Sequence, residues 1–221
     1  MYCKDNPVMY VDPSGMIFKK IWDDFVNFLK NDVVQAVVGT VLSTIAIIGG
    51  CLLVATGMGG PIGSMLISAG ISSLIGGYNS LSSGGSFFAG WVGGAINGAI
   101  AGAFPLGIGR IFGNTLGSFV GSLITDSIDK GFGKNNKSFS NMLGDAGINA
   151  GLSFATSWII GGMFDDVIQF CGKELINELS KELVGVAMQI FFGLCNAIGA
   201  IIGNVIISKR NKLFILRIGV K

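Results

Sequence analysis

The sequence predicts an all-α fold, and three observations support it. Residues 33–109 contain no charged residue. Glycine accounts for 36 of the 221 residues and recurs at every fourth position in two stretches. Four-residue spacing places residues on one face of a helix, where glycine lets a second helix approach closely. A short extended segment is expected only at the amino terminus, where turn residues flank residues 8–11.

The composition narrows the surroundings in which such helices would be stable. Charged residues make up 13% of the chain and the mean hydropathy is +0.66, whereas an ordinary soluble domain has roughly 25% charged residues. The net charge of +2 gives no general attraction to nucleic acid. A run this long without charge is expected in a lipid bilayer or in a core sealed by many helices, and both alternatives stay open here.

The missing residue types exclude several kinds of active site. The chain has no histidine, which excludes Ser-His and Cys-His nucleophile pairs and His-ligated metals. Its four cysteines are far apart and form no C-x-x-C pair. We therefore predict no catalytic residue, no metal ligand and no cofactor. The chain is not expected to be an enzyme, and an enzyme that works through carboxylates alone is the weaker alternative.

The amino-terminal residues 1–16 carry the most specific motif, MYCKDNPVMYVDPSGM. By themselves they predict a short strand between two turns. Their spacing resembles the P-x4-D-P-x-G-L signature that closes the core of RHS/YD-repeat polymorphic toxins, and residues 2–6 resemble the Y-x-x-N-N segment that precedes it. Met16 stands where that family usually has leucine. The positions that match the signature, with the residue that follows it, are Pro7, Asp12, Pro13, Gly15, Met16 and Ile17.

The resemblance implies that residues 1–16 end an RHS core and that the toxin cargo follows. In that family the repeats build a hollow β-shell that cuts its own chain after this signature. The cut would fall here between Met16 and Ile17, with Asp12 as a candidate participant. The implied partners are the RHS shell of the parent protein and a cognate immunity protein. Since residues 1–16 do not resemble a secretory signal, export as part of a larger bacterial protein is expected.

The following residues predict helices of two kinds. Residues 17–32 predict an amphipathic helix that suits a membrane interface or the surface of a helical core. Residues 33–125 predict apolar, glycine-rich helices. Within them, residues 33–54 extend about 33 Å at helical rise, which is enough to cross a bilayer. A shorter helix at 62–75 is expected to end at Gly76 and Gly77, before a polar loop at residues 78–85.

Two glycine series predict close helix packing on either side of a turn at residues 104–107. We expect them to form an antiparallel hairpin that pairs through its glycine faces. In lipid the first helix is marginal alone, because only about five of its residues strongly favour insertion. The packing glycines are Gly90, Gly94, Gly98 and Gly102, then Gly109, Gly113, Gly117 and Gly121. The side chains expected to bond across the groove are Asn97, Asn114, Thr115 and Ser118.

The second half of the chain is less apolar. Residues 126–145 predict a solvated polar connector, because they combine charges with the loop GKNNKS. Residues 146–208 predict a second helical region, with an amphipathic helix at 164–183 and an uncharged helix at 184–208. Residues 209–221 form a basic tail, and a basic cluster after an apolar span is typical of a terminal membrane helix.

Taken together, these patterns favour a membrane-inserting segment, pore-forming or permeabilising, of an RHS-type polymorphic toxin. Its expected partner is the lipid bilayer of a target cell, where a homo-oligomer is one form that it could take. Two alternatives stay open. The helices could be a translocation or linker segment that carries a downstream toxin enzyme across a membrane, or they could form a soluble helical bundle.

Overall fold

The computed structural model confirms the all-α fold over the residues that it describes. These are residues 31–56, 60–104 and 107–171, with short helical pieces between residues 19 and 27 and between residues 198 and 209. No strand occurs among them. Residues 1–18 lie outside the described residues, and with them the whole motif that resembles the RHS signature. The helices are α2 (Asp32–Ala55), α3 (Gly60–Ser82), α4 (Phe87–Gly102), α5 (Gly107–Gly131) and α6 (Phe139–Cys171).

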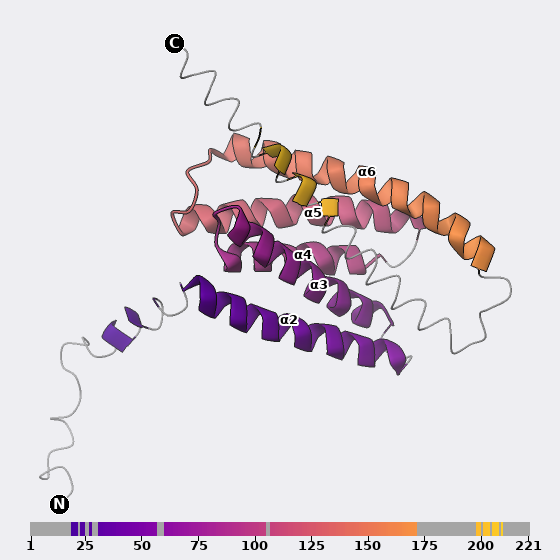
Figure 1. Ribbon diagram of the computed structural model, residues 1–221, viewed down its shortest axis with the longest axis horizontal. Coiled ribbons are helices and arrows are strands. Elements are labelled where there is room, and N and C mark those ends of the chain that lie inside the picture. The colour runs from indigo at the N-terminus through magenta and orange to yellow at the C-terminus, as the bar shows by residue number, and fades with distance from the viewer. Residues whose placement is uncertain are drawn as a thin grey trace, which may run out of the picture.

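The five helices run up and down in chain order (Figure 1). Each helix packs on the next one along the chain, from α2 on α3 to α5 on α6. Because successive helices are antiparallel, the starts of α2, α4 and α6 lie at the same end of the bundle as the ends of α3 and α5. We call this the charged end, since an ion pair there joins Lys134 to Asp32 and further acidic residues lie beside it.

Local sequence explains where the helices begin. The Asn31 side chain accepts a hydrogen bond from the Val33 N–H at 3.0 Å and caps α2. Ser86 does the same for α4, because its hydroxyl accepts from the Ala89 N–H at 3.1 Å. Two turns contain glycines with positive φ, Gly84 after α3 and Gly133 after α5. These positions suit glycine because other residues rarely adopt that conformation.

The predicted end of the helix at residues 62–75 is wrong. We expected the helix to stop at Gly76 and Gly77, but α3 continues to Ser82. Both glycines lie in contact with α4: a Cβ on Gly76 would overlap the Gly90 carbonyl oxygen, and one on Gly77 would lie 2.7 Å from the Phe87 ring. The glycine pair therefore makes room for a neighbouring helix and does not end its own.

The predicted solvated connector at 126–145 is shorter than expected: residues 130–141 are mostly exposed, but the stretches on either side of them are helical and partly buried. Helix α5 continues to Gly131 and α6 begins at Phe139, so only residues 132–138 are not helical. The acidic residues of this stretch are buried, with Asp145 only 2% exposed and Asp126 and Asp129 little more. Farther on, we expected a new amphipathic helix at 164–183. Residues 164–171 instead continue α6, which shows no break before them. The remainder of the expected helix, residues 172–183, lies outside the described residues.

Candidate functional site

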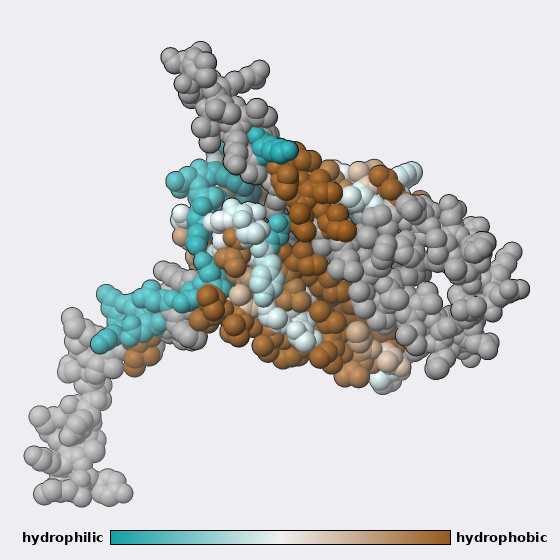
Figure 2. Space-filling view, viewed as in Figure 1, coloured by the Kyte–Doolittle hydropathy of each residue, from teal (hydrophilic) through white to brown (hydrophobic). Residues whose placement is uncertain are grey.

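Large apolar side chains cover the outside of α2. Val33 is 71% exposed and Leu52 63% exposed, although both would be expected inside a soluble protein. Figure 2 shows this surface as a brown area, with the hydrophilic residues gathered at one end. Two described helices, α2 and α3, are long and apolar enough to span a membrane, and only 17% of the apolar stretch of α2 is buried.

The same kind of surface continues on the other side of the bundle. Helix α5 exposes apolar residues near its start, and α6 exposes Trp158, which is 61% accessible and stacks on Phe154. We call these exposed side chains together the apolar belt. Its members on α2 are Val33, Val37, Val38, Val41, Leu42, Ile45, Ile48, Leu52 and Leu53, and those on α5 and α6 are Ile108, Phe112, Leu116, Leu143, Phe154, Trp158 and Ile159.

The core, in contrast, consists largely of small and polar residues. Eight of the ten buried residues of α3 are glycine or serine, and the other two are Ile67 and Ile71. Helix α2 buries only Gln35, Gly39, Ser43 and Gly50. Soluble proteins show the opposite distribution, whereas helices that pack within lipid meet through small residues and hydrogen-bonding side chains. The described bundle therefore buries the kinds of residue through which helices meet in lipid.

Helices α3 and α4 meet through two stripes of small residues, and we call this contact the α3–α4 seam. A Cβ on Gly90, Gly94 or Gly98 would overlap a backbone carbonyl oxygen of α3, and one on Gly102 would lie 2.7 Å from the Met65 Cα. No side chain longer than hydrogen fits there. The facing stripe on α3 has the same four-residue spacing and consists of Ser64, Ser68, Ser72, Gly76 and Ser80.

The second glycine series lies against a different face of α4. A Cβ on Gly117 would lie 2.6 Å from the Asn97 carbonyl oxygen, and one on Gly121 would lie 2.5 Å from that of Gly93. Gly113 lies against the Phe104 ring, whereas Gly109 makes only ordinary contacts, at 3.6 Å or more. Helices α4 and α5 thus form an antiparallel hairpin, but its two glycine series do not face each other, because the series on α4 is used by α3.

Helices α5 and α6 meet through paired polar side chains, and we call this contact the α5–α6 seam. Asn114 donates to Ser157 at 2.9 Å, the hydroxyls of Ser118 and Ser153 share a hydrogen bond, and Asn149 donates to Ser122 at 2.6 Å. These pairs recur at four-residue intervals on both helices. The expected bond from Thr115 to another helix is not formed, because its hydroxyl donates to the Ile111 carbonyl of its own helix.

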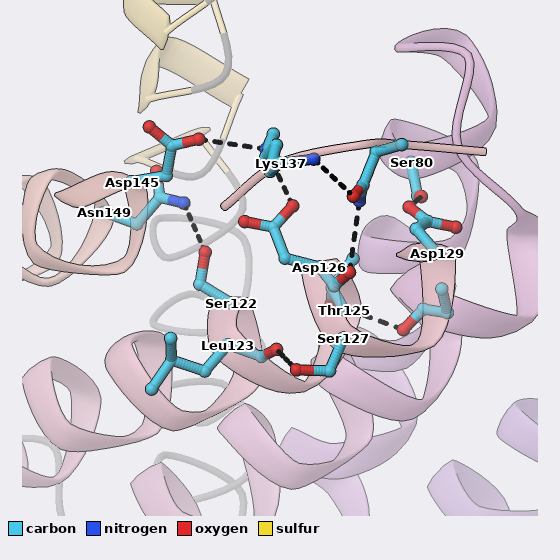
Figure 3. Close-up of polar contacts among 12 residues, drawn as sticks. Ser80, Ser122, Leu123, Thr125, Asp126, Ser127, Asp129, Lys137, Asp145 and Asn149 are labelled. Atoms are coloured by element: carbon cyan, nitrogen blue, oxygen red, sulfur yellow. Dashed lines mark hydrogen bonds and ion pairs between the residues drawn. The ribbon is translucent and has the colours of Figure 1, made fainter. Parts of the chain in front are cut away.

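The charged end continues this seam with ion pairs. Lys137 Nζ lies 2.7 Å from Asp126 and 2.9 Å from Asp145, so one lysine bridges α5 and α6 (Figure 3). Burial raises the pKa of Asp126 above its ordinary value of 3.8, although the hydrogen bond and charge of Lys137 oppose this. Burial also lowers the pKa of Lys137, but its hydrogen bonds and charge interactions with Asp126 and Asp145 outweigh this and leave it above 10.5.

A further carboxylate at this end connects α5 to α4. Asp129 accepts hydrogen bonds from the backbone N–H of Ser86 at 2.8 Å and from its hydroxyl at 2.9 Å. A negative charge at the start of α4 also interacts favourably with the helix dipole. Within the described part of the chain, no group of three or more His, Cys, Asp or Glu residues could hold a metal ion.

A cavity of about 230 Å³ with both polar and apolar lining lies between α3, α4, α5 and α6 and reaches the charged end. The residues that line it include Ser72, Ser122, Asn97 and Asn149. Sequence analysis did not predict this cavity, since it depends on which faces of four helices turn inward. A scan against models of protein families and searches of curated proteins and solved structures found no match to this chain.

Proposed function

We propose that this chain is the membrane-inserting segment, pore-forming or permeabilising, of an RHS-type polymorphic toxin. The observation that carries the proposal is the inverted burial pattern, with glycine and serine inside and the apolar belt outside. In water such a bundle leaves its largest apolar side chains solvated. In hydrocarbon, the nine belt residues of α2 at roughly −0.3 to −0.6 kcal/mol each would favour insertion by about 3 to 5 kcal/mol.

The position of the charges supports a transmembrane orientation. Helix α4, with 16 residues, extends about 24 Å. The uncharged part of α5, residues 111–125, extends about 22 Å, and that of α6, residues 146–164, extends about 28 Å. The hydrocarbon core of a bilayer is about 30 Å thick. Each of the five described helices thus has an uncharged section for lipid while the charged end lies at one surface, although only α2 and α3 are both long and apolar enough to cross the bilayer alone.

The resemblance of residues 1–16 to the RHS signature supports the biological setting. In that family the segment after the signature is toxin cargo, and a membrane-inserting cargo would act in the target cell without catalytic residues. Its expected partners remain the RHS shell and a cognate immunity protein.

Vesicle binding and ion release test the proposal. The purified full chain is mixed with vesicles of phosphatidylethanolamine and phosphatidylglycerol, and flotation and potassium release are measured. The wild type should float with the vesicles and release potassium. Val41→Lys combined with Ile45→Lys should weaken binding at least about 100-fold, because each lysine at the centre of a span costs about 2.5 to 3.5 kcal/mol.

The control places the same charges elsewhere. Ser127→Lys combined with Asn141→Lys adds two lysines at exposed positions of the charged end, and this variant should bind and release at least as well as the wild type does. A wild type that stays in the aqueous fraction between pH 5 and 8 would refute the proposal. So would an α2 variant that binds and releases as well as its control.

A further inference from the structure

We propose that the charged end binds anionic phospholipid headgroups at the membrane surface. The inference rests on the proposed function and deepens it, because it names the class of lipid that the bundle recognises and the part of the bundle that recognises it. The apolar belt cannot supply such a preference, since its aliphatic side chains contact acyl chains, which are equally apolar in neutral and anionic lipids.

The lysines of the charged end are exposed. Lys130 lies in the last turn of α5 and Lys134 in the turn that follows. Lys209 is exposed as well, and it belongs to a short helical piece whose Ile207 is buried and lines the same cavity as Asp145. Lys130 and Lys209 form no ion pair with any residue that the structure describes. Their charges are therefore available to a partner outside the chain.

The carboxylates of this end, in contrast, are used inside the bundle. Asp126 and Asp145 are buried and share one lysine, and Asp129 is buried against the start of α4. Asp32 is half-buried and is paired with Lys134. Between residues 19 and 24, two exposed lysines and two exposed aspartates balance each other. The surface that the charged end presents to its surroundings is therefore cationic.

The sequence after Lys209 adds charge of the same sign. Residues 209–221 contain three lysines and two arginines but no aspartate or glutamate. They begin at the charged end, because Lys209 is described there, and residues 210–221 lie outside the described residues. The residues that follow the other end of α6 differ, since residues 172–183 contain two lysines and three glutamates. Unbalanced positive charge is thus concentrated in the part of the chain that adjoins the charged end.

Exposed aromatic side chains beside these lysines indicate lipid as the partner. Phe132 is 42% exposed and its ring centre lies 6.2 Å from that of Phe88, while Phe139 is 70% exposed. Figure 2 shows the brown surface reaching the hydrophilic end of the bundle. A free phosphate would leave these rings in water. The boundary between headgroups and acyl chains accommodates both aromatic rings and lysines, whose stems lie along the apolar surface while their charges reach the headgroups.

The strength of this attraction depends on the number of charges and on salt. Each lysine or arginine near an anionic membrane surface strengthens binding about fivefold, so two lysines together contribute about 25-fold. The attraction extends over about 10 Å at 0.1 M salt and over about 3 Å at 1 M. A neutral membrane surface offers no such attraction.

Vesicles of two compositions test the proposal without any variant. The full chain is mixed with vesicles of phosphatidylcholine alone or with vesicles that also contain phosphatidylglycerol, and the partition coefficient is measured by flotation. In 0.1 M KCl the wild type should bind the anionic vesicles at least about 25-fold more tightly. In 1 M KCl this preference should fall to about threefold or less, because ions screen the headgroups.

A pair of variants locates the contact. Lys130→Gln combined with Lys209→Gln should weaken binding to the anionic vesicles at least about tenfold and leave binding to the neutral vesicles unchanged. Lys173→Gln combined with Lys181→Gln is an equal change in the residues that follow α6, and it should weaken binding to the anionic vesicles about twofold or less. Circular dichroism in detergent identifies a variant that has lost its helices, and the lipid and salt dependence of the wild type then decides.

The outcomes separate this inference from the proposed function. A wild type that binds neither kind of vesicle refutes both. A wild type that binds both kinds equally tightly refutes the preference for anionic lipid alone. A preference that persists unchanged in 1 M KCl, or that both double variants reduce equally, refutes the charged end as the binding surface and leaves membrane insertion standing.

Discussion

The α3–α4 seam and the α5–α6 seam join neighbouring helices in opposite ways. In the first, glycine removes side chains so that backbones touch, and Gly94 and Gly98 lie against carbonyl oxygens of α3. In the second, polar side chains meet in pairs such as Asn114 with Ser157. The first depends mainly on shape, with one hydrogen bond across it from the Ser64 hydroxyl to the Gly102 carbonyl oxygen at 2.7 Å. The second depends on hydrogen bonds and, at the charged end, on charge. The two seams should therefore respond differently to substitution and to pH.

The largest effect is expected from filling the α3–α4 seam. Gly94→Val combined with Gly98→Val would force α3 and α4 apart, because their new Cβ atoms overlap backbone atoms that cannot move independently. At about 1 to 3 kcal/mol for each overpacked site, the free energy of unfolding in detergent should fall by about 2 to 6 kcal/mol. Potassium release from vesicles should fall with it.

The chain offers a closely matched control for that pair. Gly147 and Gly151 on α6 have the same four-residue spacing, and a Cβ on either one meets nothing within 4 Å. Gly147→Val combined with Gly151→Val should leave the free energy of unfolding nearly unchanged. Equal loss in both pairs would show that close approach is not the cause, and helix propensity would not explain it either, because valine has a higher helix propensity than glycine.

A smaller effect is expected from removing one polar pair of the α5–α6 seam. Ser153→Ala deletes the hydroxyl that bonds to Ser118, and such bonds between membrane helices contribute about 0.6 kcal/mol on average. The free energy of unfolding should fall by about that amount. Ser127→Ala, whose exposed hydroxyl bonds only to its own helix, should change it less. A loss of several kcal/mol would mean that the two seams do not differ as described.

The smallest effect is expected from pH, and it should come from the α5–α6 seam. Because the pKa of Asp126 is raised on folding, the folded state binds that proton more tightly. The stability that Asp126 contributes therefore increases as the pH falls toward 3.8, the ordinary pKa that this side chain has in the unfolded chain. The pKa of Lys137 is also raised, so its contribution is present below pH 10.5 and is lost at higher pH.

Unfolding measured from pH 4 to pH 11 checks both signs. In Asp126→Asn, the free energy of unfolding should no longer increase as the pH falls. It should still decrease above pH 10.5, because Asp145 still pairs with Lys137. An acid-side increase of the same size in Asp126→Asn would show that another group is responsible. The α3–α4 seam contains no titratable side chain in its two stripes and should contribute nothing to either slope.

The sequence predicted the positions of the helices better than it predicted which helices pack against each other. The position of α2 was predicted closely, because a run of 22 uncharged, mostly aliphatic residues is compatible with few structures other than a helix. The α4 helix was also located, but its glycine series was assigned to the wrong partner. The matching stripe on α3 is mainly serine, so a search for glycine alone missed it. Its four-residue spacing was present in the sequence as Ser64, Ser68 and Ser72.

Burial of charge was the other feature that sequence reasoning missed. Asp126, Asp129 and Asp145 resemble solvated residues in sequence, because they lie near lysines and a polar loop. They are buried because one lysine from the connector bridges two helices and because Asp129 caps a helix 43 residues earlier in the chain. Contacts of that separation leave no local pattern, so neither the ion pairs nor the cavity could be predicted.

The bond from Asp129 to Ser86 has a consequence for how the chain enters a bilayer. The turn after α4 joins α4 and α5 at one end, and Asp129 fastens the first residues of α4 to the last turns of α5 at the other. Two helices that are joined at both ends are expected to move as one unit. If the bundle inserts as proposed, α4 and α5 would enter the membrane together, and residues 86 and 129 would stay on the same side of it.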